Sequence, residues 1–305
     1  MYLISKAYQK VIISIELNLK TCRMLISYAN SKEEFIYKTV NGDMPIEAIK
    51  HIRKIKNQYP YTYVATMSGA KNQGLISGNK TNLFNKFGLN PKQLSIMLIN
   101  KSWFIYIGKV DIQKEKNKFS KIYGIDFIFS PFVVIYERVR KYLDSSDNSK
   151  KLYLLQEKYS CSLLIADSTK IYLGKYLIFE KDYFEEEKES TKSNVIEFDS
   201  LSSIDENIII KDLDTKIHDD INTAELGELS MASHMMEIIK GTIDNFYNDD
   251  RYAGDFVEEL LILDSYGISD NVISYLRDNI MIDIQFLQVD ICEEILKLSK
   301  MELNL

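Results

Sequence analysis

The stretch that most constrains the fold is 120–143, SKIYGIDFIFSPFVVIYERVRKYL. Gly124 stands where a glycine would end the preceding lysine-rich helix, and Ile125–Phe129 is an apolar run with the length of a buried strand. Pro131 follows where the first turn of a helix tolerates proline, and apolar residues recur on one face of that helix. The order of helix, glycine turn, strand and helix predicts half of a βαβ-type unit.

The same alternation of strands and helices runs through the whole chain. Two apolar, β-branched runs at Val11–Leu17 and Cys22–Tyr28 precede a helix at Pro45–Tyr59 and a strand at Thr62–Met67. The remaining predicted strands are Glu34–Val40, Ser95–Asn100, Trp103–Val110, Lys151–Gln156, Ser160–Ala166, Lys170–Leu173, Tyr176–Glu180, Glu259–Leu263 and Ile284–Val289. Further helices are predicted at Asp111–Tyr123, about 223–248, Asp270–Asn279 and from Asp290 onward, and a Gly/Asn-rich loop at 72–82.

Each half of the chain is therefore a strand meander followed by helix, strand and helix. This repetition predicts a duplicated α/β fold with two lobes, residues 1–148 and residues 149–305. An acidic insertion at 182–220 interrupts the second lobe, with thirteen Asp or Glu against four Lys. A segment with this composition is typical of a solvated loop, and a strap that binds a partner is the alternative. We expect proteases to cut it first.

Composition narrows the class of protein. No window has the ~18 consecutive apolar residues of a membrane span, and the N-terminus lacks a signal-peptide core. We therefore expect a cytoplasmic chain. The cysteines are odd in number, far apart and embedded in apolar patterns, which favours reduced core thiols over metal ligands: Cys22, Cys161 and Cys292.

The common catalytic motifs are absent, since the chain has no GxSxG, HExxH or GxxxxGK[ST]. The histidines are scattered and are expected at the surface or in packing roles: His51, His218 and His234. Lys101–Lys109 is aromatic and basic, but Trp103, Ile105 and Ile107 alternate as in a half-buried strand. A core strand is therefore favoured over a nucleic-acid platform or a partner surface. We expect no metal, no cofactor and no direct nucleic-acid partner.

The succession of Val11–Tyr28, Tyr63–Gly69, Lys118–Tyr142, Leu163–Phe179 and Glu259–Leu287 resembles the actin-like cytoplasmic proteins of type IV pilus and type II secretion machines. These are the PilM proteins, the cytoplasmic domains of GspL proteins, and the MshI proteins. The resemblance covers nearly the whole chain in order and spacing. It implies an actin-like (ribonuclease H-like) duplicated α/β fold.

The positions that would bind ATP depart from the pattern of that family. Actin-like ATPases hold phosphates in two hairpin turns of the type D-x-G-(S/T), in which glycine lets backbone amides approach the anion. In the first turn Ser14 stands at the Asp position and Glu16 at the Gly position. The second turn, at 164–170, is too short for a phosphate loop, and Asp167 with Ser168 is typical of a tight turn.

The third signature, a glycine pair under the adenine, keeps one glycine, Gly267, after Asp264 and an inserted Tyr266. The resemblance therefore implies a protein that is not an enzyme, with degenerate nucleotide positions and no cofactor. It implies a scaffold at the cytoplasmic face of the inner membrane. The scaffold links an assembly ATPase to membrane components of a type II secretion, type IV pilus or DNA-uptake (natural transformation) machine.

Two alternatives remain open at this point: a nucleotide-binding pilus assembly protein of the PilM type, and a sugar-kinase-like enzyme, which the missing phosphate turns disfavour. The chain would be peripheral to the membrane or anchored through a segment beyond Leu305, and a homodimer is compatible with this interpretation. The most basic predicted surface is our choice for an acidic partner or lipid headgroups: Lys114, Lys116, Lys118, Lys121, Arg138, Arg140 and Lys141. Phe119, Ile122 and Val139 should then be core.

Overall fold

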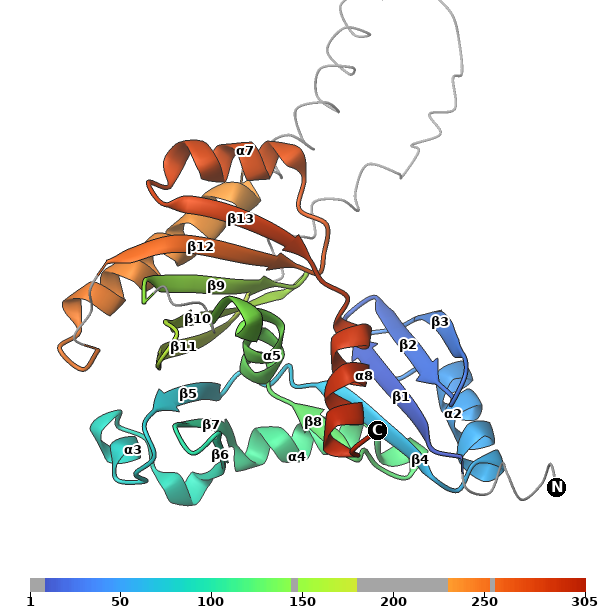
Figure 1. Ribbon diagram of the computed structural model, residues 1–305. Helices are drawn as coiled ribbons and strands as arrows, with labels where there is room; N and C mark the ends of the chain where they lie inside the picture. The colour runs from blue at the N-terminus through green and yellow to red at the C-terminus, as the bar shows by residue number, and fades with distance from the viewer. Residues whose placement is uncertain (1–8, 144–147, 180–229, 253–255) are drawn as a thin grey trace, which may run out of the picture.

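A computed structural model describes residues 9–143, 148–179, 230–252 and 256–305. The acidic stretch 182–220, with His218, lies outside these residues. The fold is α/β and contains two sheets (Figure 1). No helix among the described residues is long and apolar enough to cross a membrane.

The first sheet has five strands in the order β3 (Lys32–Lys38), β2 (Thr21–Ser27), β1 (Val11–Leu17), β4 (Thr62–Met67) and β8 (Phe127–Phe129). The first three strands form an antiparallel meander, and β4 runs parallel to β1 and to β8. Because side chains alternate along β1, its two faces have different partners.

One face of β1 packs against α2 (Ile46–Gln58), which buries an apolar stripe that includes Ile49, Ile52 and Ile55. The other face packs against α8 (Ile291–Glu302), where Cys292 and Leu296 contact β1 and β2. The sheet is therefore covered by one helix from the start of the chain and one from its end (Figure 1).

The second sheet has eight strands in the order β13, β12, β9, β10, β11, β5, β7 and β6. Their bounds are β5 (Gln73–Ser77), β6 (Leu94–Ile99), β7 (Trp103–Gly108), β9 (Lys150–Gln156), β10 (Ser160–Ala166), β11 (Ile171–Ile178), β12 (Val257–Asp264) and β13 (Asp283–Gln288). β12 is parallel to its neighbours β9 and β13, and the remaining pairs are antiparallel.

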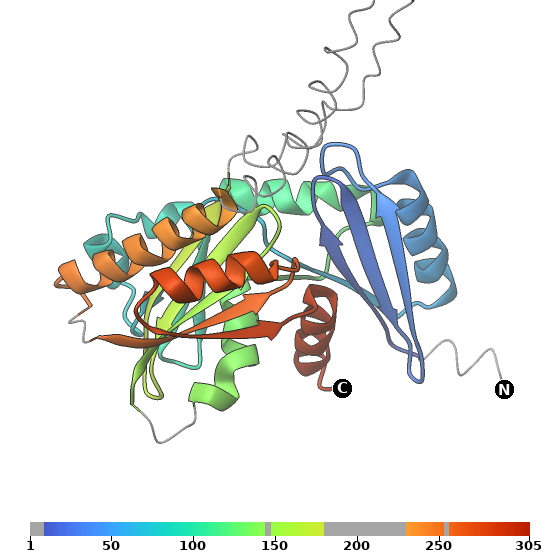
Figure 2. The ribbon, with the colours of Figure 1, turned by 90° about the horizontal axis from the view of Figure 1, so that it is seen from above.

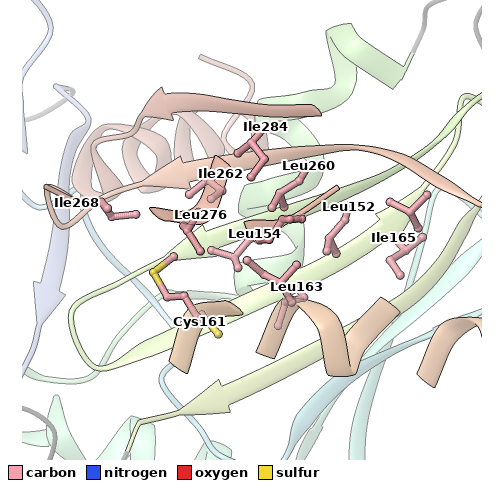
Figure 3. Packing of buried hydrophobic residues seen from close by; sticks show 14 of the residues in the cluster. Leu152, Leu154, Cys161, Leu163, Ile165, Leu260, Ile262, Ile268, Leu276 and Ile284 are labelled. Carbon is pink, nitrogen blue, oxygen red and sulfur yellow. The ribbon is translucent and has the colours of Figure 1, made fainter. Parts of the chain in front are cut away.

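Helices cover this sheet on both faces (Figure 2). The helix over 230–248 and α7 (Asp270–Asn279) pack on one face, where Leu154, Leu163 and Ile262 belong to a large apolar cluster (Figure 3). α5 (Pro131–Leu143) and α8 pack on the other face, in a second cluster. α8 therefore contributes to the core of both sheets.

Two segments of the chain lie on the other side of the predicted boundary at 148/149 from the sheet to which they belong. β5, β6 and β7 precede the boundary yet extend the second sheet, because β5 pairs with β11. α8 follows the boundary yet packs on the first sheet. The two sheets are thus built from interleaved parts of the chain rather than from successive halves.

Two local predictions were wrong, both at glycines. The predicted loop at 72–82 contains β5, where Gly74 leaves room for the ring of Tyr106 on the neighbouring strand. The two strands predicted at 170–173 and 176–180 are the single strand β11, in which Gly174 lies against Leu75. Each glycine permits close packing between strands and does not mark a turn.

The helix predicted at Asp111–Tyr123 is α4 (Lys109–Lys118) followed by a 3-10 turn, η2 (Ser120–Ile122). Gly124 ends this segment with φ of 95° and donates its N–H to the Phe119 carbonyl, as predicted. The short elements that complete the fold are α3 (Leu83–Lys86) and η1 (Pro91–Gln93). The expected core residues Phe119, Ile122 and Val139 are buried, and the three cysteines are free and buried.

Candidate functional site: an acidic cleft between the sheets

A cavity of about 60 Å³ lies where the two sheets meet. The ends of β1 and β4, the helix α4, the β9–β10 turn and the start of α8 surround it. Its polar lining consists of Glu16, Thr66, Ser68, Glu115, Lys118 and Glu157. Three glutamates and one lysine therefore face a space that can hold a few water molecules.

Glu16 enters this cleft from the end of β1. Burial raises the pKa of its carboxyl, and Arg23 on β2, 3.9 Å away, lowers it in part. Arg23 also pairs with Glu34 on β3 and with Asp290. Asp290 caps α8 by accepting the N–H of Glu293 at 3.0 Å, so the arginine connects the first sheet to α8.

Glu157 faces the cleft from the turn between β9 and β10. Burial raises the pKa of its carboxyl to about 7; the hydroxyl of Ser160, which donates to it at 2.8 Å, lowers the pKa, and the charge of Glu16 raises it. A substantial fraction of Glu157 is therefore protonated at neutral pH. Its protonation state sets the charge of the cleft.

Glu115 and Lys118 lie on successive turns of α4 and pair at 2.8 Å. This pair is neutral overall, so Glu16 and Glu157 give the cleft a negative charge that Arg23 offsets only in part. An anion such as a phosphate would meet carboxylates here, where a phosphate site presents backbone N–H groups. Among the described residues, no group of three His, Cys, Asp or Glu side chains could hold a metal ion.

The two positions of the first lobe that the sequence predicted as degenerate nucleotide positions, Ser14 and Glu16, lie on β1 next to this cleft. Glu16 lines it directly. Ser14, two residues earlier, is fully buried, and its hydroxyl donates to the Leu25 carbonyl at 3.3 Å. The Ser14 hydroxyl is therefore bonded within the sheet, to β2, and Ser14 does not line the cleft.

Asp264 and Gly267 form the loop that follows β12. Asp264 accepts the N–H groups of Tyr266, Gly267 and Ile268 at 2.8–2.9 Å, and Gly267 has φ of 94°. Ser265 donates to the carbonyl of Gln156, which holds this loop beside the turn that carries Glu157. Asp264 thus has a structural role in its own loop.

Asp167 and Ser168 lie elsewhere. They form the turn between β10 and β11, in which Asp167 accepts the N–H groups of Thr169 and Lys170, as the tight-turn interpretation predicts. This turn is at the far end of β10 from Glu157, and a strand of seven residues spans ~20 Å. Asp167 therefore does not line the cleft.

In the second lobe, the turn that lines the cleft is the one between β9 and β10, which form the first hairpin of that lobe. Sequence reasoning missed Glu157 because it matched the phosphate pattern to the later hairpin. The available signal was the symmetry of the two lobes: the first hairpin of each, β1–β2 and β9–β10, brings a glutamate to the cleft.

The predicted basic partner surface is divided by the fold. α4 and α5 lie on opposite sides of the sheets (Figure 2), so their basic residues do not form one patch. Most of these side chains are paired within the chain: Lys114 with Asp111, Lys118 with Glu115, Arg138 with Glu294 and Arg140 with Glu137. Lys121 is exposed after α4, and the side chain of Lys141 lies outside the described residues.

Solved structures show which class of fold this is. The PilM-PilN type IV pilus biogenesis complex matches at 11% identity, with a TM-score of 0.56 over 94% of this chain and 89% of that chain. A protein of Bacteroides thetaiotaomicron with an actin-like ATPase fold and unknown function matches at 11% identity, with a TM-score of 0.50 over 94% and 93%. At these identities the likeness shows the fold alone, which confirms the predicted two-lobed actin-like fold.

The sequence also matches two family models. Residues 152–304, half of the chain, match a family described as a domain of unknown function (DUF8341), and the chain belongs to that family. Residues 8–136 match a second domain of unknown function (DUF8569). No curated protein matches the sequence.

Proposed function

We propose that this protein is a non-catalytic actin-like scaffold at the cytoplasmic face of the inner membrane. In this role it links an assembly ATPase to membrane components of a type II secretion, type IV pilus or DNA-uptake machine. A scaffold of this kind transmits force or order through the geometry of its lobes and through contacts, and it requires no chemistry at the cleft.

The observation that carries the proposal is the pair of glutamates in the cleft. Glu16 and Glu157 come from the first hairpin of each lobe, where an actin-like nucleotide site would need amide donors for phosphates. With Glu115 paired to Lys118, the remaining lining opposes a polyphosphate anion. This arrangement favours the scaffold over the nucleotide-binding alternative.

The assignment to a pilus-type or secretion-type machine rests on structural similarity to a protein of such a machine. The PilM of the PilM-PilN complex shares the fold over nearly the whole of this chain, and that complex belongs to type IV pilus biogenesis. By analogy, the partners of this protein would be inner-membrane assembly proteins and the ATPase that serves them. The cytoplasmic and membrane-associated location follows from the same analogy.

Ligand-induced stabilisation tests the cleft. A nucleotide at 100-fold excess over its dissociation constant would stabilise the folded protein by about 2.7 kcal/mol, a shift of several degrees in melting temperature. We expect millimolar Mg-ATP to leave the melting temperature unchanged. A rise that disappears in Glu16→Arg would establish nucleotide binding and contradict the proposal.

Co-purification tests the partners. An affinity-tagged chain isolated from its own cells with the membrane fraction should retain an assembly ATPase and inner-membrane assembly proteins, identified by mass spectrometry. A chain that is recovered from the soluble fraction free of both would contradict the scaffold role. Lys121→Glu and Arg140→Glu test the predicted basic residues separately, because Lys121 follows α4 and Arg140 lies on α5, and both are exposed. We expect a variant in the interface to lose partners while its stability falls by no more than ~1 kcal/mol, and a variant that retains them as wild type removes that side of the molecule from the predicted surface.

A further inference from the structure

The outer edge of β6 is an unprotected strand edge. β6 is the last strand of the eight-stranded sheet, and no strand of the described chain pairs with its outer side (Figure 1). Its sequence, LSIMLI, has no charge and no proline, and Met97 and Leu98 are 61% and 43% exposed. Edge strands present unpaired N–H and C=O groups, and proteins usually protect them with charges, proline or short length.

The other sheet edges have this protection. β3, at one edge of the first sheet, carries four exposed charges among its seven residues, Lys32, Glu33, Glu34 and Lys38. β8, at the opposite edge, has three residues. β13, at the far edge of the second sheet, begins with the exposed Asp283. Among the described strands, β6 is therefore the edge that combines length, apolar side chains and no charge.

Lysines predominate around β6, although Asp111 on α4, which pairs with Lys114, lies beside Gly108, the β7 partner of Leu94. Residues 48–110 contain no Asp or Glu. Around β5, β6 and β7 there are six exposed lysines, none of which forms an ion pair with a described residue: Lys71, Lys80, Lys86, Lys92, Lys101 and Lys109. Lys109 donates to the carbonyl of Lys92 at 2.8 Å, which holds two of these charges just before β6, and Lys101 lies in the turn just after it.

We propose that β6 is a docking edge for an extended acidic segment of a partner protein, which adds to the sheet as a further strand. Backbone hydrogen bonds along the edge would supply affinity. Met97 and Leu98 are adjacent and so point to opposite faces of the sheet, where each can receive an apolar side chain of the incoming strand. The lysines at the two ends of β6 would pair with carboxylates that flank the apolar part of that segment.

Charge complementarity selects this occupant over a second copy of the chain. Two copies paired through β6 would bring the same lysines together, and like charges at an interface disfavour association. The inference goes beyond the proposed scaffold role, because it depends on the edge and its charge. It would hold equally for a protein that bound ATP in the cleft.

Designed peptides test the docking edge. The first peptide has a central Val-Ile-Val-Thr flanked by two Glu on each side, and the second replaces every Glu with Lys. Fluorescence anisotropy with the full chain should show binding of the Glu peptide, weakened at least several-fold by high salt, and no binding of the Lys peptide. Equal binding of both peptides, or of neither, would overturn the proposal.

Variants place the binding at β6. The double variant Met97→Glu, Leu98→Glu should bind the Glu peptide at least tenfold more weakly, since it adds like charge and removes the apolar contacts. The matched control is Ile36→Glu, a 66% exposed isoleucine on the protected edge β3, which should bind as wild type. Because the double variant could fail to fold, Lys92→Glu with Lys101→Glu provides a second test at exposed positions. Both β6 variants should retain the wild-type circular dichroism spectrum.

Other binding partners of the β6 edge would give different experimental results. Dimerisation that rises with protein concentration and is lost in the Met97→Glu, Leu98→Glu variant would assign the edge to a second copy. Binding of a single-stranded oligonucleotide in place of the Glu peptide would assign the lysines to a nucleic acid. Either result would overturn the proposal of an acidic protein partner.

Discussion

Replacing Glu157 with glutamine should stabilise the protein above neutral pH and leave it unchanged in acid. The carboxyl is half-buried at the cleft, and burial together with the charge of Glu16 raises its pKa from 4.5 to about 7. A carboxyl whose pKa is raised on folding resists ionisation in the folded state, so its ionisation opposes folding. This cost is absent below about pH 4.5 and is fully present above about pH 7.

The size of the effect follows from the shift in pKa. A shift from 4.5 to about 7 corresponds to ~3 kcal/mol in the free energy of unfolding, and the access of water to the cleft makes this an upper value. About 2 kcal/mol of this cost develops between pH 5.5 and pH 8.5. The glutamine side chain would keep an acceptor for the Ser160 hydroxyl, so Glu157→Gln removes the charge with little other change.

Urea unfolding followed by circular dichroism at about pH 5.5 and pH 8.5 measures this cost. The difference between variant and wild type should grow by about 1–2 kcal/mol from the lower to the higher pH. Glu258→Gln, at an exposed glutamate on β12, is the matched control and should show no such growth. If Glu157→Gln is equally or less stable than wild type at pH 8.5, Glu157 does not carry a raised pKa and the electrostatic description of the cleft is wrong.

Three further substitutions test individual contacts of the fold, each measured by urea unfolding. Asp264→Ala leaves three loop N–H groups without their acceptor and should cost about 2–3 kcal/mol. Gly174→Ala would place a Cβ 2.6 Å from the Cβ of Leu75 and should cost about 1–3 kcal/mol, whereas a neutral result would mean that β5 and β11 can separate. Arg23→Met should cost ~1 kcal/mol, and a double-mutant cycle with Asp290→Asn should show coupling between the first sheet and α8.

The sequence predicted most elements because local patterns and tertiary structure agree there. β4, β10 and α7 lie within the predicted residue ranges, since apolar periodicity and flanking turn residues mark their ends. The errors fall at Gly74 and Gly174, where glycine usually signals a turn. In this fold each glycine instead makes room for a side chain from a neighbouring strand, which depends on residues distant in the sequence.

The candidate site was harder to predict because it is assembled from the ends of distant segments. Glu16 could be recognised, since its hairpin is the first of the chain and its position relative to the phosphate pattern is fixed. Glu115 has no marker in the sequence, because a glutamate three residues before a lysine on a helix is typical of a surface ion pair. Only the packing of α4 across the gap between the sheets makes it part of the cleft.

Glu157 shows what determines the chemistry of the cleft. The β9–β10 turn faces the β1–β2 hairpin because both lobes repeat one topology, so the residue types near the ends of the two hairpins decide whether an anion is accepted or repelled. Glu16 lies at the end of β1 and Glu157 lies in the β9–β10 turn; the charge of Glu16 raises the pKa of Glu157, and protonation of Glu157 lowers the repulsion as pH falls. Because the two carboxylates together repel phosphate, replacing both Glu16 and Glu157 with glycine should raise the affinity for Mg-ATP more than either single replacement. A double variant that gains no affinity for Mg-ATP over wild type in a thermal shift assay would show that the shape of the cleft, and not its charge, excludes the nucleotide.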